Sequence, residues 1–187
     1  MEKHSFSIKS SLPEINKVND AFDALLSEKL SDKLILERKT KFIEEFKVIS
    51  YELFSNCIIH NESPTIYYET FFNIGNVELV VYSQGKGFSL KPLYNNENEV
   101  VYNAPFPDYF HNQIITVYEG IDSKVDCLVL NNNQLRFRVT NLDNPSFETD
   151  TLPEHFGLYL IASLSDSFEY SRSENGVDVY KISKIIN

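Results

Sequence analysis

The chain has 187 residues, of which 42% are hydrophobic, and it carries a formal net charge of -10. This length and apolar content fit one domain with a substantial core. The negative charge argues against broad neutralisation of phosphate groups, so nucleic acid and anionic membranes are excluded as expected partners.

No stretch of the sequence approaches the apolar length of a membrane span. Cys57 and Cys127 form neither a disulfide framework nor a metal-type spacing, which favours a reducing compartment. We therefore expect a cytoplasmic protein. The histidines are too scattered to predict a metal cluster, and they are His4, His60, His111 and His155.

The first predicted elements are a short strand at residues 6–8 and an amphipathic helix over 15–26. Ser11 and Glu14 have the spacing of a capping box at the start of that helix. Its apolar residues recur at helical period, which predicts packing on a core. The charged segment 31–40 predicts a connection to the next helix.

A longer amphipathic helix is predicted to end near His60. Its apolar residues recur every three or four positions, and they are Phe42, Phe46, Ile49, Leu53 and Cys57. Glu52, Asn56 and His60 are four apart, so they share one stripe at the margin of the buried face. This stripe suits a ligand site, and the alternative is an ordinary solvated helix edge.

Antiparallel hairpins and one short helix make up the rest of the prediction. Residues 89–112 mix aromatic residues with asparagine and proline and predict irregular structure. A short apolar helix is predicted to begin at Gly157. The hairpins pair 65–72 with 77–82, 125–130 with 135–140, and 168–171 with 177–182. This order predicts an α+β fold, a two-layer sandwich with a mostly antiparallel sheet and helices on one face.

Two stretches together resemble the histidine-kinase-like (GHKL) ATPase superfamily. They are YELFSNCIIHN, which contains Glu52 and Asn56, and FGLYLIASLSDSFEYSRSENGVDVYKIS, which contains Gly157. Within that superfamily the chain resembles the small bacterial anti-sigma factor serine/threonine kinases, whose first strand and helix the opening FSIKSSLPEINKVNDAFDALL also resembles. The resemblance covers most of the chain. It implies a single domain of that ATPase fold, with an insertion around 89–125.

The resemblance implies roles for individual residues. Asn56 matches the asparagine that holds Mg²⁺ against the nucleotide phosphates, and an amide oxygen suits that ion. Glu52 matches the carboxylate that takes the proton from the attacking hydroxyl. Gly157 matches the second glycine box, where backbone amides meet phosphate. His60 would lie near the same pocket. Glu52 and Asn56 should therefore face the same cavity as the start of the helix at Gly157.

The glycine boxes depart from the family pattern. The first box normally supplies an aspartate to adenine, and here two positions compete for that contact. Ser83 precedes Gly85 and Gly87 but is not acidic. Asn141 keeps an amide acceptor, ends the clearest strand pair and implies a short lid, so it is the favoured adenine contact. In the second box His155 occupies the first glycine position.

The implied function is a regulatory protein that binds ATP with Mg²⁺ and phosphorylates or sequesters a protein partner. By resemblance that partner is an anti-sigma antagonist or a sigma factor, and a homodimer is compatible with the sequence. The alternative is a catalytically inactive protein-interaction module on the same fold. Retained magnesium-dependent nucleotide binding would distinguish the two.

Overall fold

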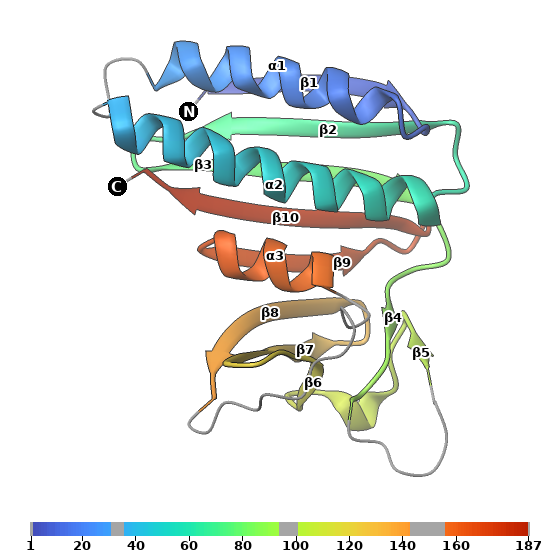
Figure 1. The fold of residues 1–187 in the computed structure, drawn as a ribbon. Helices are drawn as coiled ribbons and strands as arrows, with labels where there is room; N and C mark the ends of the chain where they lie inside the picture. Colours follow the sequence, from blue (N-terminus) through green and yellow to red (C-terminus); the bar gives the residue numbers. More distant parts are fainter. Residues whose placement is uncertain (1, 31–35, 94–100, 143–155, 187) are drawn as a thin grey trace.

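An eight-stranded sheet in the order β1-β2-β3-β10-β9-β8-β7-β6 forms the framework of the fold, and all neighbouring strands are antiparallel (Figure 1). The computed structural model describes residues 2–30, 36–93, 101–142 and 156–186. The strands of the sheet are β1 (Glu2–Lys9), β2 (Thr65–Phe72), β3 (Asn76–Gln84), β6 (Ile114–Glu119), β7 (Ser123–Asn131), β8 (Gln134–Asn141), β9 (Ser167–Arg172) and β10 (Val177–Ile185).

Three helices of the described chain lie on one face of this sheet (Figure 1). They are α1 (Glu14–Lys29), α2 (Leu36–His60) and α3 (Phe156–Leu164). The predicted α+β class with an antiparallel sheet is confirmed. The three expected hairpins are present, each extended by one to three residues at its strand ends.

Helix α1 buries the predicted apolar face, but its start differs from the prediction. The helix begins at Glu14 with Pro13 as its cap, and no side chain caps it. The Glu14 carboxylate instead accepts a hydrogen bond from Lys17, at 2.7 Å. The Glu14 N–H donates to the backbone carbonyl of Ser11, at 3.0 Å. The predicted Ser11–Glu14 capping box is therefore wrong, because the helix starts after Pro13, which makes Glu14 its first residue rather than its third.

Helix α2 buries the whole predicted stripe from Phe42 to Cys57. It begins at Leu36, so residues 36–40 are helical rather than part of a connection, and residues 31–35 lie outside the described part of the chain. The Lys39 ammonium donates to the carbonyl of Ser27, at 2.7 Å, and so joins the start of α2 to α1.

The face of the sheet opposite the helices carries pairs of opposite charge. Strand side chains alternate between the two faces, and the charged pairs bridge neighbouring strands along the uncovered face. The pairs are Lys3 with Glu69, Lys181 with Glu78, Arg136 with Glu169, and Arg138 with Asp126. This alternation explains why the helices cover only one face.

The described residues of the range 89–125, which are 89–93 and 101–125, hold more regular structure than expected. Strand β6 was not predicted, and it pairs with β7 at the end of the sheet. Strands β4 (Ser89–Leu90) and β5 (Tyr102–Asn103) form a small separate pair, followed by a single 3-10 turn at Asp108–Phe110. Part of this segment thus extends the sheet beyond β9.

Candidate functional site

A cavity of about 300 Å³ opens beside α2, the start of α3, the end of β3 and the beginning of β10. Its apolar lining includes Leu53, Leu158, Ile161 and Phe168, and its polar lining includes Glu52, Asn56, His60, Ser83 and Asp178. An apolar pocket with a few converging polar groups is the usual form of a small-molecule site.

The stripe predicted on α2 faces this cavity. Glu52 and Asn56 are partly buried, and His60 at the end of the helix is exposed. All three line the cavity together with Gly157 at the start of α3. The prediction that Glu52 and Asn56 face the same cavity as the start of this helix is confirmed.

Gly157 lies directly against the Glu52 side chain. A Cβ atom at position 157 would meet the Oε2 atom of Glu52, so a larger residue there would displace the end of this side chain. The Glu52 carboxylate therefore sits near the amino end of α3, where free backbone N–H groups favour negative charge. Burial nevertheless raises the pKa of Glu52 above its ordinary value.

Glu52→Gln should raise the free energy of unfolding at pH 7 relative to the wild type. Because the pKa of Glu52 is raised in the folded state, folding favours its protonated form, and wild-type stability falls as the pH rises through that value. Denaturant unfolding across pH measures the difference, which should vanish below about pH 4.3. Glu44→Gln, at an exposed position of α2, is the matched control. A pH-independent gain would contradict this explanation.

The structure brings Ser83, not Asn141, to this cavity. Asn141 at the end of β8 lines a second cavity of about 480 Å³, together with Asp122 and Tyr159. Strands β10 and β9 lie between β3 and β8, so the end of β8 is remote from α2. Asn141, the favoured adenine contact, therefore does not line the cavity that contains Asn56, because β8 lies beyond β10 and β9 in the sheet. His155 lies outside the described residues.

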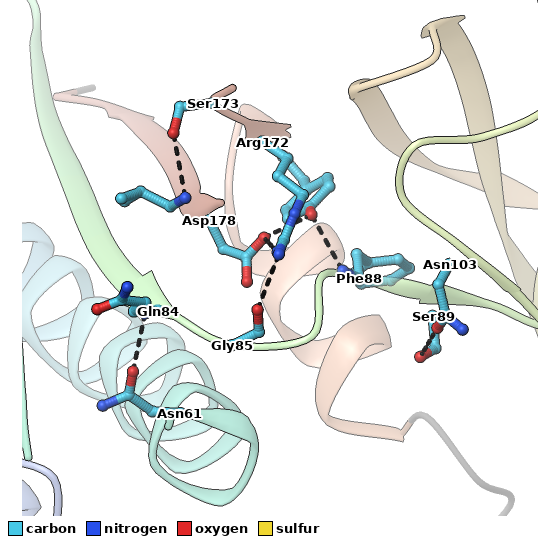
Figure 2. A network of polar contacts seen from close by, with 11 residues as sticks. Asn61, Gln84, Gly85, Phe88, Ser89, Asn103, Arg172, Ser173 and Asp178 are labelled. Carbon is cyan, nitrogen blue, oxygen red and sulfur yellow. Dashed lines mark hydrogen bonds and ion pairs between the residues drawn. The ribbon is translucent and has the colours of Figure 1, made fainter. Parts of the chain in front are cut away.

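Sequence reasoning missed Asp178. It is 2% exposed, and it lies on β10 directly opposite Ser83 of β3. Its Oδ1 atom accepts hydrogen bonds from the Tyr170 hydroxyl, at 2.7 Å, and from the Arg172 guanidinium, at 2.6 Å (Figure 2). The alternation of the strand could have indicated it. Asp178, Tyr180 and Ile182 are two residues apart and face the helices, so the pattern places a carboxylate on the covered face of the sheet.

The segment that follows β3 is fastened to this network. Arg172 also donates to the carbonyl of Gly85, at 2.9 Å, and the Phe88 N–H donates to the Tyr170 hydroxyl, at 3.0 Å (Figure 2). A Cβ at Gly85 would collide with the backbone carbonyl of His60, so glycine permits this contact with the end of α2. These bonds hold the cavity wall that contains Phe88.

Cys57 is a buried thiol next to the polar end of the cavity. Burial raises its pKa strongly, so it is protonated at neutral pH. The described residues contain no group of three or more histidine, cysteine, aspartate or glutamate side chains placed to hold a metal ion. A cation here would need additional ligands from a bound molecule. Across the same residues, none of the helices combines the length and apolar character needed to span a bilayer.

Comparisons with known proteins provide no family assignment. No protein-family model matches the chain, and no curated protein sequence is significantly similar to it. A functional assignment therefore depends on the residues of the cavity and on the motif resemblance.

Proposed function

We propose that this chain is a cytosolic regulatory protein that binds ATP with Mg²⁺ in the cavity between α2 and α3. In this proposal it transfers phosphate to a serine or threonine of a protein partner, as the anti-sigma factor kinases that it resembles do. One observation carries the proposal: Glu52, Asn56 and the start of α3 at Gly157 share a single cavity.

The lining fits the parts of such a ligand. Leu53, Leu158 and Ile161 offer apolar contacts to a flat ring. The Asn56 side chain offers an amide oxygen, and Mg²⁺ commonly takes only one or two protein ligands when phosphates and water supply the others. When bound, Mg²⁺ would neutralise charge on the phosphates.

Glu52 would act as the general base in this proposal. Its carboxylate would accept the proton of the attacking hydroxyl while that oxygen bonds to the γ-phosphorus and ADP leaves. A raised pKa makes a carboxylate a stronger base than an ordinary surface glutamate, which supports this role. Glu52 and Asn56 lie one helical turn apart, so the base and the metal ligand would serve the same phosphate.

A specific observation favours the second candidate, an inactive protein-interaction module. The Glu52 side chain fills the space against Gly157, at the helix end where a phosphate would otherwise approach. A carboxylate that remained there would repel a nucleotide, and the chain would then act through its surfaces alone.

Calorimetric titration of the purified chain with ATP, with and without Mg²⁺, tests the proposal. We expect saturable binding that weakens strongly when EDTA removes the magnesium. A matched titration with adenosine and Mg²⁺ shows whether the phosphates contribute. Absence of any heat of binding for ATP would overturn the nucleotide proposal and favour the interaction module.

A further inference from the structure

The two oxygen atoms of Asp178 have different surroundings. Oδ1 receives both hydrogen bonds, one from Tyr170 and one from Arg172. None of the hydrogen bonds or ion pairs found among the described residues ends on Oδ2, and Figure 2 shows both dashed lines meeting a single oxygen of this side chain. Asp178 lines the cavity, so Oδ2 is the oxygen left to accept a donor there.

The Oδ2 atom of Asp178 is open to the cavity. It is not among the buried polar atoms without a partner that the described residues contain, although the residue as a whole is only 2% exposed. The lining around it includes Leu53, Ile161 and Phe168. A ligand N–H group that reached Oδ2 would donate to a carboxylate in largely apolar surroundings, where such a bond is stronger than in water, so the site favours ligands with a donor at that point.

Ser83 supplies the complementary group. It is 5% exposed, lies opposite Asp178 in the β3–β10 register and lines the same cavity. A hydroxyl can donate one hydrogen bond, whereas an ionised carboxylate can only accept. The two side chains therefore present an acceptor and a donor side by side.

The geometry points to Asp178 Oδ2 and the Ser83 hydroxyl as the pair that recognises an exocyclic amino group next to a ring nitrogen, which is the N6/N1 edge of adenine. This inference rests on the proposed nucleotide function and assigns the residues that contact the base of ATP. Hypoxanthine has a carbonyl oxygen where adenine has the amino group, and that oxygen would meet the carboxylate. Guanine would need a carboxylate with two free oxygens to accept its paired N–H groups, and Oδ1 of Asp178 is already occupied.

Titrations with ATP and with ITP, both with Mg²⁺, test this inference through a ratio of affinities. The wild type should bind ATP roughly tenfold or more tightly than ITP, as expected for a hydrogen bond to a charged group. In Asp178→Asn the amide can keep its oxygen toward Tyr170 and Arg172 and present its NH₂ in place of Oδ2. That change should reduce or reverse the preference, because the NH₂ donates to the hypoxanthine carbonyl and no longer accepts from adenine.

Two further variants make the result decisive. Asp126→Asn removes another carboxylate that is 2% exposed, on the uncovered face of the sheet, and should leave the ratio unchanged. Ser83→Ala should weaken binding of both nucleotides, because a hydroxyl can donate to N1 of adenine or accept from N1–H of hypoxanthine. If Asp178→Asn unfolds, the wild-type ratio decides. Equal affinities of the wild type for ATP and ITP, or an unchanged ratio in folded Asp178→Asn with ATP still bound, would overturn this inference alone. Failure of the wild type to bind either nucleotide would overturn the proposed function as well.

Discussion

Replacing Asn56 by alanine should weaken binding of ATP in the presence of Mg²⁺ by at least about tenfold, the lower end of the loss seen when groups that support a metal ligand are removed. The change deletes the amide oxygen that we assign to the metal, and it should also abolish the difference between titrations with and without Mg²⁺. Asn56 is only partly buried on the cavity side of α2, so the helix should remain folded. Calorimetric titration measures the affinity.

Asn141→Ala is the matched control for that experiment. It removes the same amide from an exposed position that lines the other cavity. We expect ATP to bind this variant as it binds the wild type. Equal losses in the two variants would contradict the assignment of the ligand to the cavity beside Glu52, and so would unchanged binding in Asn56→Ala.

Phe22→Ala should lower the free energy of unfolding by about 3–5 kcal/mol, the usual cost of deleting a buried aromatic ring. Phe22 is 1% exposed and lies where α1, α2 and β2 meet. Its ring centroid is 5.3 Å from that of Phe46, 6.4 Å from that of Phe54 and 5.6 Å from that of Tyr68. Alanine would leave a void among three rings from two other elements. Urea unfolding followed by circular dichroism measures the change.

Ile74→Ala provides the comparison for Phe22→Ala. Ile74 is fully exposed in the turn between β2 and β3, so its truncation removes a large apolar side chain without creating a cavity. Its effect should stay within about 0.5 kcal/mol. A loss below about 1 kcal/mol in Phe22→Ala would mean that α1 does not pack on α2 and β2 as described.

Sequence pattern was sufficient for most of the individual elements. The apolar residues of α2 recur at helical spacing, and those of β7 and β8 alternate. Each of these patterns is strong enough to predict its own element correctly. Strand β6 was missed because its neighbourhood is crowded with asparagine, proline and aromatic residues, which obscure a short alternating run. The capping box at Ser11 was wrong for a different reason, since the helix begins two residues later than the box requires, directly after Pro13.

The candidate site could be predicted only in part. Glu52, Asn56 and His60 were found together because helical spacing alone places them on one stripe. The choice between Ser83 and Asn141 as the adenine contact required the order of strands in the sheet. The length of the predicted lid does not indicate that order. Asp178 carried no motif, and its importance depends on its place opposite Ser83.

The sequence by itself determined the local elements of this protein and the polar stripe on α2, because backbone periods and turn residues act over a few positions. Only the tertiary structure decided which groups meet that stripe. Strand β10 inserts between β3 and β9, so Ser83 and Asp178 become neighbours although they are distant along the chain. Such contacts depend on the packing of the whole sheet, because no short stretch of sequence indicates which distant strand it will pair with.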